Sequence, residues 1–152
     1  MQRVFAILAS LQVLAVVAQF FLATAGAFDT APMDEAFAPH RTLAYGIALF
    51  GIVLTIVAAL ARMPGRIIGM TALVAGLVVV QSLIRALADS LNSADDTSTT
   101  AGTLVFGLHA VNGLIILAVA ASVARRARAR YRAAVAGSPD AAEGAVVEGT
   151  TR

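Results

Sequence analysis

The sequence predicts an all-α protein, a four-helix transmembrane bundle of up-down-up-down topology followed by a disordered C-terminal tail. The chain of 152 residues is 59% hydrophobic and 13% charged, and a soluble domain carries about twice that share of charge. Four apolar runs of about twenty residues each match a hydrocarbon core of roughly 30 Å at about 1.5 Å per helical residue. Arginines gather on one side of the arrangement that these runs predict.

The first predicted helix covers residues 4–25, after a short polar start that contains Arg3. Gln12 and Gln19 share one helical face, and this face should look into the bundle because an amide in lipid is costly. A cleaved signal peptide is the rival interpretation, since Ala23-Thr24-Ala25 is typical of a cleavage site. The apolar run is longer than a signal-peptide core, which favours a retained helix.

The second predicted helix covers residues 40–61. It follows an acidic loop with two prolines, and it begins with the dipeptide His40-Arg41. One of its faces is small and slightly polar, and consists of His40, Ala44, Ala48, Gly51 and Thr55.

The third predicted helix covers residues 67–88 and follows a tight Pro64-Gly65 turn with an arginine at each end. Its small residues provide a face for close helix contact, and they are Gly69, Ala72, Ala75 and Gly76.

The fourth predicted helix covers residues 103–124 and contains His109 near its start. It leads into a basic extension, residues 125–132, which we expect to stay helical at the lipid surface. Residues 1–132 therefore form one transmembrane domain. Residues 133–152 lack any apolar periodicity, which predicts a disordered cytoplasmic tail.

The arginines predict the orientation of the bundle. Eight of them fall on one side of a four-span arrangement and only Arg41 on the other, and the positive-inside rule places the richer side in the cytoplasm. The eight are Arg3, Arg62, Arg66, Arg125, Arg126, Arg128, Arg130 and Arg132. We therefore expect a multi-pass protein of the cell membrane with both termini cytoplasmic and both histidines toward the outer face.

The two histidines of the chain, His40 and His109, carry the functional hypothesis. The second and fourth helices are parallel in this topology, so both imidazoles lie in the same leaflet. Two neutral imidazoles that face each other inside a four-helix bundle are a ligand set for iron, which makes b-type haem the candidate cofactor. The residues expected at the site are His40, His109, Arg41, Arg85, Ala44, Gly113 and Asn112.

These residues have separate expected roles. Ala44 and Gly113 lie one turn after the histidines and leave room for the ring of the cofactor. Asn112 is placed to orient an imidazole or to bond a partner, and Arg41 and Arg85 stand at the level of the propionates.

Structural histidines are the alternative, because a histidine at the end of a membrane helix can cap the helix or meet lipid headgroups. Depth also counts against a shared ligand: Arg62 lies about 33 Å of helix from His40, whereas Arg125 lies only about 24 Å from His109. Arg85 has a structural interpretation too, in which it pairs with Asp89 and extends its side chain to the interface.

The composition excludes several classes of function. The chain has no cysteine, so a disulfide, a thiolate metal site and a cysteine nucleophile are excluded. The sequence contains no catalytic triad, phosphate loop or zinc-protease motif, which favours a non-enzymatic role. The basic residues gather beside the membrane, so lipid and its anionic headgroups are the expected partners of the arginine-rich extension, and nucleic acid is not.

A second hypothesis belongs to a different class. In it the protein is a non-catalytic small subunit or scaffold that packs against a larger membrane complex, or against further copies of itself, through its Gly/Ala faces.

Four segments resemble a family of small actinobacterial four-helix membrane proteins of unknown function. They are QFFLATAGAF (19–28), HRTLAYGIALFGIVL (40–54), ARMPGRIIGMTAL (61–73) and HAVNGLIILAVAASVARRAR (109–128). The resemblance covers most of residues 1–130 and implies the four-helix fold without an activity.

More distantly, the chain is similar to one four-helix half of haem A synthase, in which a His-Arg opens the second helix and a His opens the fourth. His40, Arg41 and His109 match that pattern, which implies haem ligation. The glutamate that precedes the first of these histidines in that family is replaced here by the run Phe37-Ala38-Pro39. The resemblance therefore implies haem ligation without synthase chemistry.

Overall fold

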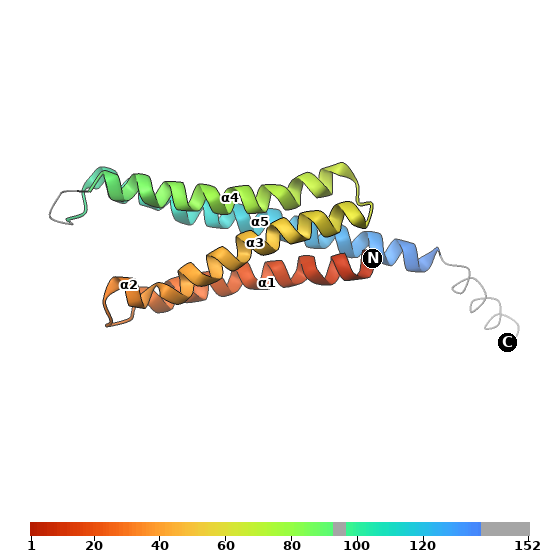
Figure 1. The fold of residues 1–152 in the computed structure, drawn as a ribbon, viewed down its shortest axis with the longest axis horizontal. Coiled ribbons are helices and arrows are strands. Elements are labelled where there is room, and N and C mark those ends of the chain that lie inside the picture. Colours follow the sequence, from red (N-terminus) through yellow and green to blue (C-terminus); the bar gives the residue numbers. More distant parts are fainter. Residues whose placement is uncertain (93–96, 138–152) are drawn as a thin grey trace, which may run out of the picture.

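The computed structural model describes residues 1–92 and 97–137, and within them it is helical apart from short connections and has no strand. The helices are α1 (Gln2–Ala27), α2 (Met33–Ala36), α3 (Ala38–Leu60), α4 (Gly65–Ser90) and α5 (Thr100–Ala136) (Figure 1). All but α2 are long and apolar enough to cross a membrane. The predicted four-helix fold is therefore confirmed. The predicted tail from 138 to 152 lies outside the described residues, as do Asp95 and Asp96.

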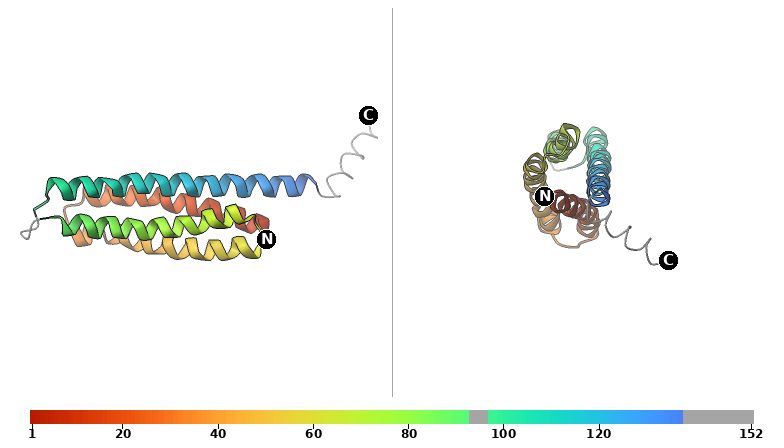
Figure 2. Two further views of the ribbon diagram at one scale, coloured as in Figure 1. Left: turned by 90° about the horizontal axis from the view of Figure 1, so that it is seen from above. Right: turned by 90° about the vertical axis from the view of Figure 1, so that its right-hand side faces the viewer.

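The four long helices occupy the corners of a bundle, and chain neighbours run in opposite directions (Figures 1 and 2). Helix α1 packs against α3 and α5, and α4 packs against the same two helices. Helices α3 and α5 therefore stand at diagonally opposite corners. We call the end that carries α2 and the α4–α5 connection the histidine end. The opposite end, with the start of α1 and the α3–α4 turn, is the arginine end.

The turn at the arginine end has the hydrogen bonds of a Schellman motif. After α3 ends at Leu60, Arg62 adopts a φ of 51°, the left-handed conformation that reverses a chain after a helix. The amides of Arg62 and Met63 donate to the carbonyls of Ala59 and Ala58. These bonds satisfy carbonyls that the helix end leaves free, so the predicted tight turn is confirmed.

Helix α2 lies in the segment that the sequence analysis assigned to a loop. Pro32 precedes its first turn, and Asp34 and Glu35 lie within that turn. The positive end of the helix dipole stabilises their negative charges there. Pro39 lies in the first turn of α3. The N–H groups of a first turn have no partner within the helix, so the missing N–H of proline costs no helical hydrogen bond there. Local signals thus explain both helix starts.

Helix α5 continues without a break through residues 125–132, and also through 133–136, which the sequence analysis placed in the tail. It runs straight past the other helices along the bundle axis (Figure 2). Ala and Arg are strong helix formers, and the first glycine after this run is Gly137. Composition therefore accounts for the length of α5.

Two apolar clusters fill the bundle. The cluster at the arginine end includes Phe5, Leu54, Ala58, Val123 and Ala124, and the other, nearer the middle, includes Val16, Ile47, Val78 and Ile116. Toward the histidine end, α3 has no buried residue before Ile47. The other elements approach closely there, because a Cβ on Gly26 would meet the Ala36 carbonyl and a Cβ on Gly102 would meet the Ala88 carbonyl.

Gln12 and Gln19 of α1 donate hydrogen bonds to backbone carbonyls of α3. The sequence predicted that the helical face carrying these two glutamines would look into the bundle. Gln12 is 2% exposed and its Nε2 donates to the Ile47 carbonyl over 3.2 Å. Gln19 Nε2 donates to the His40 carbonyl over 2.8 Å. Because the helices are antiparallel, the same register produces both bonds, so the two glutamines fix α1 against α3.

Replacing Gln12 with leucine should lower the free energy of unfolding by about 1 kcal/mol, since interhelical hydrogen bonds in membranes contribute about 0.6 kcal/mol on average and up to about 1.7. Reversible unfolding in mixed detergent micelles measures the change. Leu11→Gln is the matched control, because it exchanges the same two side chains at an exposed position where no bond to α3 is involved. A Gln12→Leu variant as stable as the wild type would contradict the role given to this bond.

Candidate functional site

The two histidines meet at the histidine end of the bundle. His40 comes from α3 and His109 from α5, and their ring centroids lie 6.3 Å apart with the rings inclined at 42°. Both side chains are half-buried. Two helices at opposite corners of the bundle thus bring their imidazoles together across its interior.

The expected difference in depth between His40 and His109 was counted from Arg125 as the inner end of the last span. The structure extends the packed part of α5 beyond Arg125. Ala127 and Tyr131 of α5 belong to the same apolar cluster as Ala61 and Met63. Helix α5 therefore stays in the bundle for about two turns beyond Arg125. Counted from Tyr131 rather than Arg125, the distance to His109 equals about 33 Å of helix, the same as from Arg62 to His40.

The backbone of α1 fixes the proton position on His40. Its Nδ1 lies 3.2 Å from the carbonyl oxygen of Gln19. A carbonyl oxygen only accepts hydrogen bonds, so Nδ1 carries the proton in the neutral ring and the lone pair is on Nε2. The ring also meets Phe37 edge to face, with centroids 6.1 Å apart.

His109 has a different environment. Its ring stacks on Phe106, one turn earlier in α5, with centroids 5.3 Å apart and planes inclined at 17°. Its Nδ1 is buried without a hydrogen-bond partner, although the backbone of Gln81 lies close enough to interact with the ring. The two histidines therefore differ in what holds each ring.

Asn112 and Gly113 both contact residues of other helices rather than a histidine ring; for Asn112, bonding a partner was one of the two expected roles. Asn112 is 6% exposed and its Nδ2 donates to the Leu77 carbonyl over 2.9 Å and to Gln81 Oε1 over 2.8 Å. It thus ties α5 to α4. A Cβ on Gly113 would lie 3.3 Å from the ring of Phe20, so an α1 side chain fills the room that this glycine was expected to leave. Ala44 lies half-buried on the same side of α3 as His40.

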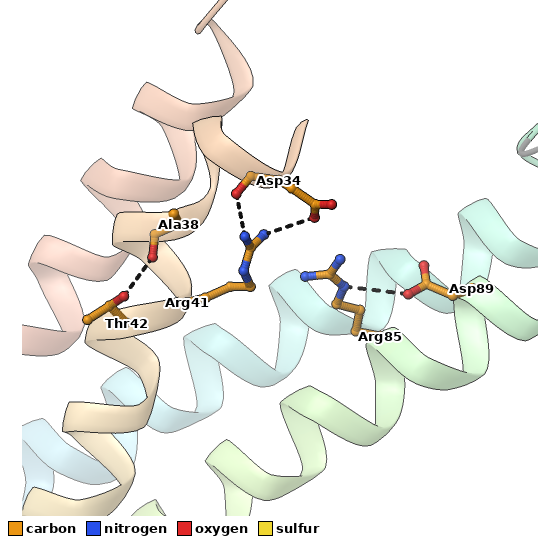
Figure 3. A network of polar contacts seen from close by, with 6 residues as sticks. All are labelled: Asp34, Ala38, Arg41, Thr42, Arg85 and Asp89. Carbon is orange, nitrogen blue, oxygen red and sulfur yellow. Dashed lines mark hydrogen bonds and ion pairs between the residues drawn. The ribbon is translucent and has the colours of Figure 1, made fainter. Parts of the chain in front are cut away.

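Arg41 and Arg85 lie at the rim of the site, and both come within electrostatic range of His40. Arg41 pairs with Asp34 of α2 over 3.6 Å and also donates to the Asp34 carbonyl. Arg85 pairs with Asp89, one turn further along α4, over 3.5 Å (Figure 3). The ion pair between Arg85 and Asp89 that the structural interpretation predicted is present. Each of the two arginines at the rim therefore has an acidic partner.

Four residues of the site were not predicted in these positions: Phe20, Phe37, Phe106 and Gln81. Phe106 lies three residues before His109, a spacing that puts two side chains on one helical face, so the sequence contained that signal. Phe20 and Gln81 come from other helices, and their positions depend on how the helices cross. No sequence pattern reports that crossing.

The site is built from two imidazoles, and other metal ligands do not gather around them. In the described parts of the chain, no group of three or more His, Cys, Asp and Glu side chains is placed to hold a metal ion. A bare zinc site, which takes three or four protein ligands, is therefore a poor match to these residues. A cofactor that brings its own equatorial ligands needs only two.

A model of a family of unknown function (DUF6220) matches residues 19–88. The matched segment begins at Gln19, contains His40, Gln81 and Arg85, and ends before His109. The match carries no activity, cofactor or host group. No curated protein and no solved structure matches the chain.

Proposed function

We propose that this multi-pass membrane protein binds b-type haem, with His40 and His109 as its two axial ligands, and that it transfers electrons or carries haem. The observation that supports this proposal most directly is the 6.3 Å between the ring centroids of the two histidines. If the two ligating nitrogens lay on the line between the centroids, two metal–nitrogen bonds of about 2 Å each and about 1 Å from each nitrogen to its ring centroid would add up to about 6 Å.

The proton on His40 supports the same role. A metal ligand needs a free lone pair and a fixed ring, and ligating histidines commonly donate the other ring N–H to a carbonyl or carboxylate. The contact from His40 Nδ1 to the Gln19 carbonyl provides both conditions. His40 would therefore ligate through Nε2.

The porphyrin needs room that the surrounding side chains have to leave. Phe20 lies against Gly113, and it would have to turn away for the ring to reach that part of α5. Helix α3 has no buried residue before Ile47, so such a movement of Phe20 would not have to displace a buried side chain of this part of α3. Arg41 and Arg85 would face the propionates at the rim, where water also reaches these carboxylates.

A haem with two imidazole ligands takes up and releases one electron without an open coordination position. The contribution of this chain is to hold the two rings from opposite corners of the bundle. Gln19 sets one ring, and the apolar layer of Val16, Ile47 and Ile116 shields the site from the arginine end.

The test is the absorption spectrum of protein purified from haem-replete cells. We expect a Soret band of a low-spin, six-coordinate species, at about one haem per chain, and loss of that species in the double variant His40→Ala/His109→Ala. Thr71→Ala is the matched control, because it alters a buried polar side chain of α4 near the arginine end, away from both rings. A wild-type protein that is folded and free of a Soret band would overturn the proposal.

A second candidate function, a small subunit or scaffold, is favoured by the outer surface of α4. Gly69, Ala72 and Gly76 are exposed there, and a Cβ on either glycine would meet no atom within 4 Å. The predicted face for close helix contact also included Ala75. Among the described residues, Ala75 makes such a contact, because it lies against Gly51 of α3. The open glycines suit a helix of another membrane protein.

The double substitution Gly69→Leu/Gly76→Leu tests the second candidate. A membrane partner that copurifies with the wild type in mild detergent should be lost, and the haem content should not change. Gly46→Leu, at another exposed glycine with open space around it, is the control. Equal recovery of the partner with both variants would count against this surface.

A further inference from the structure

We propose that the arginine end of the bundle binds a lipid whose headgroup combines a phosphodiester with hydroxyl groups, such as the glycerol headgroup of phosphatidylglycerol. The site is a groove between the first residues of α1 and the last turns of α5. It lies at the opposite end of the bundle from the two histidines. The proposal therefore goes beyond haem binding and does not depend on it.

The groove has a volume of about 320 Å³, and its described lining residues are Gln2, Arg130, Ala133 and Ala134. The two alanines present only methyl groups, so Gln2 and Arg130 are the polar side chains of this lining. Helix α1 contacts α5 along the bundle, and α5 runs on past the start of α1 (Figure 1). Residues of two helices thus form one concave surface.

The position of the groove suits a lipid headgroup. Phe5 of α1 and Tyr131 of α5 belong to the apolar cluster at the arginine end. Gln2 lies one turn before Phe5, and Arg130 directly precedes Tyr131, so the groove borders the last apolar layer of the bundle. Exposed apolar side chains follow along α1 from Val4 onward. A molecule with a polar group in the groove can therefore lay acyl chains along the outside of the bundle.

Arg130 provides a positive charge that no acidic side chain of the described residues neutralises. The ion pairs in this part of the chain are Arg41–Asp34 and Arg85–Asp89. All four acidic side chains of residues 1–92 and 97–137 belong to the histidine end. Helix α1 also begins without a side-chain cap, so the free N–H groups of its first turn add positive potential. The charges at the groove therefore favour an anion, and a guanidinium binds a phosphate through charge-assisted hydrogen bonds.

Gln2 requires a hydrogen-bond donor. Its Oε1 is buried and has no hydrogen-bond partner in the part of the chain that the structure describes, which is costly unless another molecule donates to it. A carboxamide oxygen only accepts, so a hydroxyl satisfies it and an ionised phosphate oxygen does not. The residue is half-buried, and rotation of its terminal amide brings this oxygen to the groove.

The two side chains together select the ligand. Arg130 binds the phosphate, and Gln2 accepts from a hydroxyl of the same headgroup. An ammonium could also donate to Gln2, but a zwitterionic headgroup has no net charge for this positive end to attract. A polyol phosphodiester with a net negative charge meets both requirements.

The first experiment measures lipid binding to the full chain in detergent by native mass spectrometry. Phosphatidylglycerol is compared with phosphatidylmethanol, which has the same charge and no headgroup hydroxyl. We expect the wild type to bind phosphatidylglycerol about threefold more tightly, a factor within the range of one hydrogen bond. Gln2→Leu should lose this preference. Equal affinity of the wild type for the two lipids would overturn the proposal.

The second experiment separates a site from a diffuse attraction by all the arginines. Arg130→Ala should bind phosphatidylglycerol about tenfold more weakly than Arg132→Ala, the loss typical of a charge-assisted hydrogen bond. Arg132 is the matched control, because it is exposed on the other side of α5 and does not line the groove. Ala134→Trp fills the groove, keeps every charge and should also weaken binding. Equal binding by the two arginine variants, or no effect of Ala134→Trp, would contradict the assignment.

The third experiment distinguishes a lipid from a soluble phosphate ester. Glycerol 1-phosphate at millimolar concentration should leave bound phosphatidylglycerol in place, because acyl chains add to the affinity of the lipid. Displacement by the soluble ester would assign the groove to a ligand from the aqueous phase and refute the lipid. The absorption spectrum of haem reports on the other end of the bundle, so the failure of either proposal leaves the other standing.

Discussion

Replacing Gly51 with leucine should lower the free energy of unfolding by about 2 kcal/mol, within the range for inserting a larger side chain into a packed interface. Gly51 is buried where α3 crosses α4, and a Cβ there would lie 3.3 Å from the Cβ of Ala75 and 3.4 Å from its backbone nitrogen. A backbone atom cannot turn aside as a flexible side chain does. The two helices therefore have to separate, and the contacts around the crossing weaken.

The matched control is Gly46→Leu in the same helix. Gly46 is exposed, and a Cβ there would meet nothing within 4 Å, so this variant should stay within about 0.5 kcal/mol of the wild type. Reversible unfolding in mixed micelles measures both variants. Equal stability of the two would mean that the α3–α4 crossing is not the tight contact described above.

Much of this architecture is present in the sequence because the membrane simplifies the problem. A span needs an apolar run of fixed length, and the runs in this chain predict α1, α3 and α4 to within two residues at each end. The face of α3 with His40, Ala44, Ala48, Gly51 and Thr55 was described from its spacing, and every one of these residues is buried or half-buried. The inward position of Gln12 and Gln19 follows from the cost of an amide in lipid.

The predictions that missed depend on relations between helices or on short local signals. The small residues of α4 were treated as one face, yet Ala75 packs on Gly51 while Gly69 and Gly76 point away from the bundle. Which of two neighbouring faces turns inward depends on the rotation of the whole helix. The four-residue helix α2 was missed because its capping signal, Pro32 with two acids after it, lies in a segment without apolar periodicity.

The histidine site shows the same division. Sequence and topology placed both rings in one leaflet, and they meet at 6.3 Å. The partners of each ring were not predictable in the same way, because Gln19 and Phe20 come from α1 and reach the site only through its register with α3 and α5. A register between antiparallel helices is set by the sum of many packing contacts, so no single residue of the sequence reveals it.

The orientation of the bundle yields the second large effect, an all-or-none result. A green fluorescent protein fused to the C-terminus of the chain should fluoresce in bacterial cells, and alkaline phosphatase fused there should be inactive. Fluorescence reports the cytoplasm and phosphatase activity the opposite side. The expectation comes from the positive-inside rule, because eight arginines lie on one side of the four spans and one lies on the other. The structure adds a second observation.

The start of α1 and the arginine extension of α5 lie at the same end of the bundle (Figure 1), so one measurement at the C-terminus fixes the side of both. Arg125, Arg126 and Arg128 lie on α5 ahead of Tyr131, which still packs against the apolar cluster at the arginine end. A phosphatase inserted between Asp29 and Pro32 should be active if the histidine end faces outward. An active phosphatase at the C-terminus would reverse the predicted orientation and place the histidine end of the bundle on the cytoplasmic side.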